Sequence, residues 1–318
     1  MSKTAFQRKR IASFFNPKLA DNDIKAGLAA AVASPDEFRK WAASLTDPIV
    51  IGLDDMSTVR GIFSVQSFSV GQEISFPVFN KDELVSQIWT VPQLYSQPTQ
   101  LPIADIAYPT TYELGTSMEW PKRMQQDGRI DVVNMCLRLI SEAIAAAEEA
   151  SGWALLKTAS TAANTAVQLD DGAAGHDSFS PQLLKLMLAR MMEHPTNPRQ
   201  QMGRQLTDIY GAPTRLLDTI DWTSMYGNAE KSAVIRSGAI DRVMGVQLTP
   251  YWGLTQYELY GFDLSAKEEA FNMALQGAFE SEELVGAADN WRVGVRVREI
   301  IGFLVKDARY LLKGIVGT

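Results

Sequence analysis

The sequence has little of what catalytic and metal sites are usually built from. Its 318 residues include one cysteine and two histidines. The lone Cys136 excludes an intrachain disulfide and a zinc site of paired cysteines, as expected in a reducing compartment. His176 lies in a glycine-rich turn and His194 precedes Pro195, places where a histidine is more often a surface or capping residue than a catalyst. No nucleophile elbow, phosphate-binding glycine loop or His-Glu-x-x-His pair occurs, so we expect no catalytic residue, no cofactor and no metal.

The sequence also lacks any apolar run of the ~18 residues needed to span a bilayer. Residues 1–10 are polar and basic with no apolar region behind them, so neither a signal peptide nor a membrane span is expected. Of the net charge of −7, residues 1–40 carry +4, which leaves −11 for the remaining chain. That acidic body should not bind nucleic acid by charge. The basic residues Arg8, Lys9 and Arg10 could contact phosphates or an acidic partner, or form a solvated tail.

Pairs of adjacent carboxylates are the remaining candidates for acid–base or metal chemistry. Adjacent side chains on a helix diverge by about 100°, so Glu148 and Glu149 are expected on a solvated face rather than as an acid and base. Asp170 and Asp171 lie in a predicted turn, where one pair is a weak indication of a cation site. Further pairs are Asp54 with Asp55 and Glu282 with Glu283.

A long helical pattern dominates the middle of the chain. Apolar or small residues recur in steps of three and four over residues 129–159, which predicts one uninterrupted helix of about 45 Å. Asp127 can act as its N-cap. The residues predicted to form its buried stripe are Ile130, Val133, Leu137, Ile140, Ile144, Ala147, Ser151 and Ala154.

Directly before this helix lies a segment with an unusual composition. Residues 84–104 contain no charge but include three prolines, which exclude a membrane helix. Together with its flanks, the segment is predicted to form two extended arms of about 50 Å. This length is too great for the arms to remain within one domain. Exposed apolar chain is costly in water, so we expect Trp89, Leu94 and Tyr95 to lie on a neighbouring subunit. The alternative is a long active-site lid.

The rest of the chain alternates between helix and strand signals. Ser180 can cap a helix over 181–193, and valines alternate with arginines in a strand over 291–305. Residues 310–316 can pair with that strand as the last one. Further strands are predicted within 49–79 and at 205–210, 242–249 and 257–264, with a short helix at 214–220.

The order of these parts resembles the major capsid protein of tailed bacteriophages, the Hong Kong 97-type shell subunit. Residues 118–133, MEWPKRMQQDGRIDVV, resemble the family's entry into its spine helix. Residues 207–213, TDIYGAP, are similar to a strand-to-helix step of its axial domain, and residues 243–248, VMGVQL, to a later strand. The resemblance covers almost the whole chain and implies an α+β fold.

The resemblance also implies a division of the chain. Its parts are an N-terminal arm (1–45), strands leading into the extension loop (46–71), the extension loop (72–116), a peripheral domain (117–180 and 288–318) and an axial domain (181–287). The arm residues Arg8, Lys9 and Arg10 would make inter-subunit or interior contacts. In the extension loop, Lys81, Trp89, Leu94 and Tyr95 would contact a neighbour. Some members cross-link through a loop lysine, but no motif here identifies a partner for Lys81.

The implied function is self-assembly into the hexamers and pentamers of an icosahedral phage head around double-stranded DNA. The implied partners are other copies of the chain, a portal protein at one vertex, a separate scaffolding protein, a decoration protein and DNA bound without sequence specificity, with no membrane. The implied location is the virion, assembled in the bacterial cytoplasm. Two alternatives remain: an encapsulin-type nanocompartment shell, and a soluble α/β enzyme with residues 72–116 as a lid.

Overall fold

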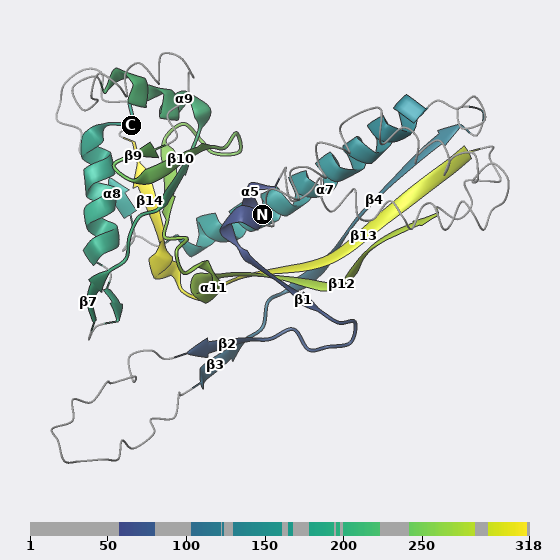
Figure 1. The fold of residues 1–318 in the computed structure, drawn as a ribbon, viewed down its shortest axis with the longest axis horizontal. Coiled ribbons are helices and arrows are strands. Elements are labelled where there is room, and N and C mark those ends of the chain that lie inside the picture. The colour runs from purple at the N-terminus through teal and green to yellow at the C-terminus, as the bar shows by residue number, and fades with distance from the viewer. Residues whose placement is uncertain are drawn as a thin grey trace, which may run out of the picture.

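The computed structural model has two β-sheets at an angle to each other, a long helix over one of them and a thin ribbon leaving the body (Figure 1). It describes residues 57–79, 103–121, 123, 130–160, 165–167, 178–193, 195–197, 200–222, 242–283 and 292–316. The predicted N-cap Asp127, both histidines and the carboxylate pairs at 54–55 and 170–171 lie outside these ranges.

The first sheet has four strands in the order β1-β12-β13-β4. Their bounds are β1 Ser64–Phe68, β4 Thr111–Pro121, β12 Phe271–Glu283 and β13 Arg292–Val305. The predicted alternation in β13 is confirmed, because Val295 and Val297 are fully buried whereas Arg296 is exposed. The two central strands, β12 and β13, are antiparallel, and β1 runs parallel to β12.

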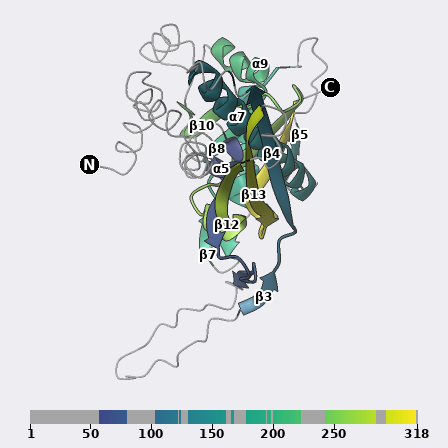
Figure 2. The same cartoon turned by 90° about the vertical axis from the view of Figure 1, so that its right-hand side faces the viewer.

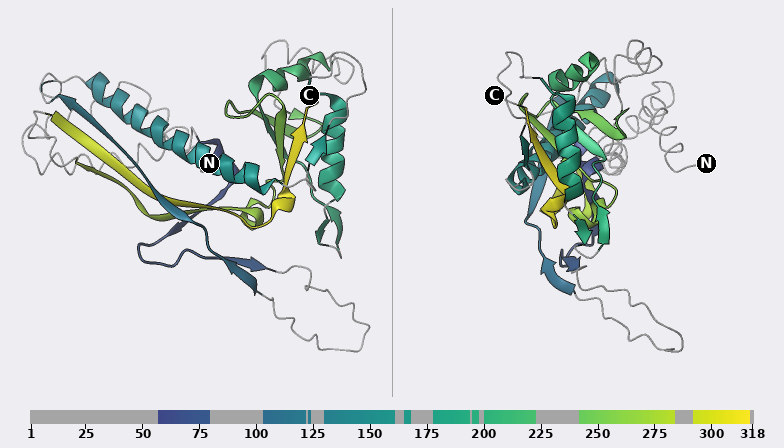
Figure 3. Two further views of the ribbon diagram at one scale, coloured as in Figure 1. Left: turned by 180° about the vertical axis from the view of Figure 1, so that it is seen from behind. Right: turned by 90° about the vertical axis from the view of Figure 1, so that its left-hand side faces the viewer.

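Helix α7, Ile130–Ala159, lies along one face of this sheet (Figure 3). The helix confirms the prediction, and Leu137, Ile140 and Ile144 are buried as expected. Its C-terminal half is rotated relative to the predicted stripe: Ala154 is exposed, and Trp153 and Leu156 are buried instead. The reason is a short helix that sequence reasoning missed, α5, Thr58–Ile62. It packs so tightly on α7 that a Cβ at Gly152 would lie 2.5 Å from Val59 Cγ1.

The second sheet has six strands in the order β5-β14-β11-β8-β10-β9. The strands are β5 Thr165–Val167, β8 Asp208–Gly211, β9 Arg242–Val243, β10 Val246–Pro250, β11 Glu258–Phe262 and β14 Leu311–Ile315. Helix α8, Pro181–Glu193, has the predicted N-cap, since Leu183 N donates to Ser180 Oγ at 3.2 Å. Its buried residues Leu184 and Met187 share a core with this sheet. The remaining elements are α9 Pro213–Leu216, the 3-10 helix η3 Leu217–Asp221, and a hairpin of β6 Pro195–Asn197 with β7 Gln200–Gly203.

The predicted pairing of the last two strands is wrong. β14 pairs with β11 and β5 of the six-stranded sheet, not with β13. Both edges of β13 are already occupied by β12 and β4, so no edge is free for a further strand. The 3-10 helix η5, Ala308–Tyr310, and the helix α11, Lys267–Ala270, lie in the connections between the sheets.

Candidate assembly surfaces and buried ion clusters

The β2–β3 ribbon leaves the body on the side opposite α7 (Figure 2). It consists of β2, Phe76–Phe79, and β3, Ile103–Ala107, paired antiparallel. Its base is fixed, because Phe76 is buried and its ring meets that of Phe68 edge to face at 5.6 Å. Ile106 and Tyr108 are 47% and 58% exposed. A fixed base and exposed apolar side chains make the ribbon suited to contact another molecule.

The outer face of α7 is a second surface with little charge. Between Glu142 and Lys157 the charged residues are Glu148 and Glu149, and both are buried. A solvent-facing helix normally carries charged residues along its outer face. The exposed positions here are instead Ala143, Ala146, Ala150 and Ala154, preceded by Met135 and Leu139.

A tryptophan on the loop between β10 and β11 is almost fully in water. Trp252 is 85% exposed, although Tyr251 before it and Leu254 after it are held in place. The ring of Tyr251 stacks on Trp153 of α7 with 4.7 Å between centroids, and Leu254 is buried. Trp252 is therefore an ordered apolar side chain presented to the outside, the residue type most enriched at the centres of protein interfaces.

Beneath α7, three charged side chains form what we call the spine cluster: Arg60 of α5, Glu148 of α7 and Glu299 of β13. Arg60 donates to both carboxylate oxygens of Glu148, at 2.9 Å from Nε and 2.7 Å from Nη2. The same Nη2 donates to Glu299 Oε1 at 2.9 Å. The side chains are 6%, 0% and 6% exposed. One buried guanidinium thus binds two buried carboxylates.

Glu149 binds the start of α5 beside this cluster. Its carboxylate accepts hydrogen bonds from Thr58 Oγ1 at 2.7 Å and Val59 N at 2.9 Å. It also accepts from Trp153 Nε1 at 3.0 Å. The expectation that Glu148 and Glu149 form a solvated face is therefore wrong. The two side chains diverge on the helix as predicted, but α5 covers both of them. Its Arg60 binds Glu148, and its N-terminal amide donates to Glu149.

One acid of the spine cluster, Glu299, has a pKa that differs from that of an exposed glutamate. Burial raises the pKa of Glu299 from its ordinary value of 4.5 to about 8. The neighbouring Glu148 adds to this effect, and Arg60 opposes it. One of the two carboxyl groups is therefore expected to hold a proton at neutral pH.

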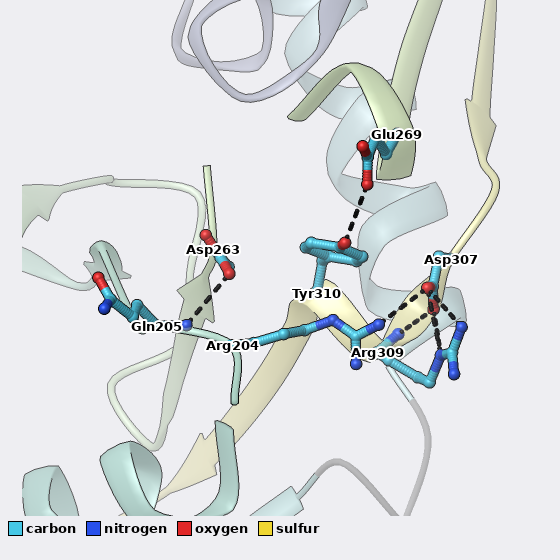
Figure 4. Close-up of polar contacts among 7 residues, drawn as sticks. All are labelled: Arg204, Gln205, Asp263, Glu269, Asp307, Arg309 and Tyr310. Atoms are coloured by element: carbon cyan, nitrogen blue, oxygen red, sulfur yellow. Dashed lines mark hydrogen bonds and ion pairs between the residues drawn. The ribbon is translucent and has the colours of Figure 1, made fainter. Parts of the chain in front are cut away.

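A second group of polar contacts, the junction cluster, lies where β13 gives way to β14 (Figure 4). Arg204 has a fully buried side chain, donates to Asp307 Oδ2 at 3.2 Å and lies 4.2 Å from the ring centroid of Tyr310. Arg309 also binds Asp307, at 2.9 Å. Tyr310 in turn donates to Glu269 of α11 at 3.1 Å. These contacts join two of the connections between the sheets, those through α11 and η5, to the segment before β8.

Around Asp307 of the junction cluster the ratio is reversed, because two arginines bind one carboxylate. Burial alone would raise the pKa of Asp307, but the hydrogen bonds and charge of Arg309, with the charge of Arg204, bring it below its ordinary value. Both clusters hold elements together.

Three solved structures share this arrangement over most of their length. The capsid of cyanophage P-SCSP1u has a TM-score of 0.56 at 12% identity, covering 81% of this chain and 87% of that one. A virus-like particle from Pyrococcus furiosus has a TM-score of 0.54 at 11% identity, covering 87% and 99%. The satellite phage P4 procapsid, which includes the size determination protein, has a TM-score of 0.51 at 12% identity, covering 85% and 90%. The chain has the Hong Kong 97-like capsid fold.

The α+β class and the capsid fold expected from the sequence are thus confirmed. No family model matches the chain, and its sequence matches no curated protein. The resemblance was therefore carried by the order of elements and not by sequence identity.

The residues predicted to make contacts in this capsid fold are not among those described. Arg8, Lys9 and Arg10 of the arm and Lys81, Trp89, Leu94 and Tyr95 of the loop all lie outside the described ranges. The described part of the chain contains no group of three or more possible metal ligands. Among its helices, none is both long and apolar enough to cross a bilayer.

Proposed function

We propose that the protein is the major capsid protein of a tailed phage, which self-assembles into the hexamers and pentamers of an icosahedral head. The observation that carries the proposal is the capsid fold across more than four-fifths of the chain, together with a ribbon that leaves the body. The exposed face of α7 and Trp252 add surfaces that a neighbouring copy would cover. The role is structural rather than catalytic.

The head would enclose double-stranded DNA held without sequence specificity. An acidic body supports this, because a lining that repels phosphate does not retain the DNA while it is packaged. A portal protein at one vertex, a separate scaffolding protein and a decoration protein would complete the particle. Assembly would take place in the bacterial cytoplasm, and the finished protein would reside in the virion.

We keep the five-part division of the chain with two changes. The arm (1–45), the strands before the loop (46–71) and the extension loop (72–116) stay as expected. β12 joins the peripheral domain, because it pairs with β13, and β14 joins the axial domain, because it pairs with β11.

A second candidate is an encapsulin-type compartment that encloses protein. The likeness to the Pyrococcus furiosus virus-like particle, which covers 99% of that chain, favours this reading over an enzyme. Electron microscopy of the purified protein tests both candidates. Closed shells are expected; nuclease-protected DNA inside particles from infected cells would support the phage head, and a cargo protein the compartment. A small uniform oligomer, even when the protein is made with its neighbouring genes, would contradict both.

The extension loop can be tested with two matched variants of the same segment. Changing Trp89, Leu94 and Tyr95 together to serine should abolish closed shells, because these side chains would lose their apolar contact with a neighbour. The unfolding temperature of the subunit should stay the same. Changing Gln87, Gln93 and Gln97 to serine is the control and should leave shells intact. Normal shells from the first variant would remove the loop from the assembly interface.

A further inference from the structure

The spine cluster has one more negative charge than positive. Arg60 contributes one positive charge, whereas Glu148 and Glu299 contribute two negative charges when both are ionised. Glu299 Oε2 is buried and, unlike Oε1, accepts no hydrogen bond. Burying an unpaired carboxylate costs free energy, and the group avoids this cost by binding a proton.

Within the described ranges, the other ionisable groups around the pair do not supply the missing positive charge. Those that face it there are Arg60 on α5, Glu149 on α7 and Tyr112 on β4, with Tyr210 and Tyr251 beyond Glu149. Glu149 brings no positive charge, and its side chain accepts hydrogen bonds from four donors of its own, on Ser57, Thr58, Val59 and Trp153. The tyrosines are neutral, because burial raises the pKa of each of the three.

We propose that the spine cluster is a proton-binding site, in which one proton shared by Glu148 and Glu299 holds α5 and α7 on the four-stranded sheet. With that proton bound, Arg60 faces one carboxylate and one neutral carboxylic acid, so charges balance. When the proton leaves, two carboxylates compete for one guanidinium in a buried space. The contact between α7 and β13 is then weakened at the place where α5 also meets them.

The direction in which pH changes stability follows from how tightly the folded and the unfolded chain bind the proton. An unfolded Glu299 loses its proton near the ordinary 4.5, whereas the folded cluster keeps it up to about 8. Between these values the folded chain binds more protons, so its stability falls as pH rises. One extra bound proton corresponds to about a tenfold fall in the folding equilibrium constant per pH unit.

The test is the pH dependence of denaturant unfolding of the full-length chain, between about pH 5 and pH 9. Glu299→Gln should lose most of the fall seen in the wild type, because the amide is neutral at every pH. The control is Glu142→Gln on α7, the helix that carries Glu148, where the side chain is 42% exposed and bonded to Arg138. It should keep the wild-type profile. A Glu299→Gln profile parallel to the wild type would overturn the proposal.

A second measurement decides the question if that variant does not fold. Infrared spectra of the wild type at neutral pH should contain the band of a buried protonated carboxylic acid, which disappears as the pH is raised through about 8. Glu148→Gln should also remove the band, because one carboxylate then faces one guanidinium. Absence of the band from the neutral wild type would overturn the proposal. Neither measurement needs shells, so the result is independent of the proposed function.

Discussion

The two ion clusters differ in the number of arginines beside each acid. In the spine cluster one arginine binds two glutamates, whereas in the junction cluster two arginines bind Asp307. The consequences for the acids are opposite: the pKa of Glu299 is raised, and that of Asp307 is lowered. The same kind of contact can therefore weaken at alkaline pH in one part of a molecule and at acid pH in another.

Removing the shared arginine of the spine cluster should have the largest effect. Arg60→Met leaves the buried Glu148–Glu299 pair without its cation, which we expect to cost about 3–5 kcal/mol of unfolding free energy at neutral pH. Chemical denaturation measures the loss. Arg138→Met, at an arginine whose side chain is 69% exposed, is the control and should cost under about 0.5 kcal/mol. A loss as small as that of the control would show that the cluster does not stabilise the fold.

Removing one arginine of the junction cluster should cost less, because Arg309 remains beside Asp307. Arg204→Met loses the bond to Asp307 and the contact with the Tyr310 ring, and we expect about 2–3 kcal/mol by the same measurement. Arg190→Met, on the exposed face of α8, is the matched control. If Arg204→Met cost more than Arg60→Met, the number of arginines beside each acid would not explain how the two clusters differ.

The smallest effect should appear on the acid side of the pH profile. Asp307 has a lowered pKa, so its contribution is fully present above the ordinary 3.8 and is lost as pH falls through the lower folded value. Asp307→Asn should therefore be less stable than the wild type at neutral pH, and the difference should shrink in acid. Asp105→Asn, an exposed position in β3, should track the wild type. A constant difference for Asp307→Asn at all pH values would contradict the assignment.

Local pattern was enough to predict the elements whose periodicity is long. α7 and α8 have helical spacing over many turns, and β13 alternates strictly, so each begins and ends within a residue of its prediction. The order of these elements was also sufficient to predict the capsid fold. Neither inference needed knowledge of which strand lies beside which.

The features that sequence reasoning missed all depend on partners far away in the chain. Glu148 and Glu149 are typical of a solvated helix face until α5 is placed on them, and α5 is five residues long with no periodicity to detect. The pairing of β14 depends on both edges of β13 being occupied. The isolated Ser57, which accepts from Arg60 N as an N-cap, was a signal that could have indicated α5.

The cap that Glu149 provides also delays the folding of α5 during synthesis. A helix as short as α5 is not stable alone in water, and its first donors find their acceptor 90 to 92 residues later in the chain. At a translation rate of about 5–20 residues per second, that acceptor emerges from the ribosome several seconds after α5 does. The first helix of the described chain is therefore completed late, and until then its apolar residues Val59 and Ile62 are available to chaperones.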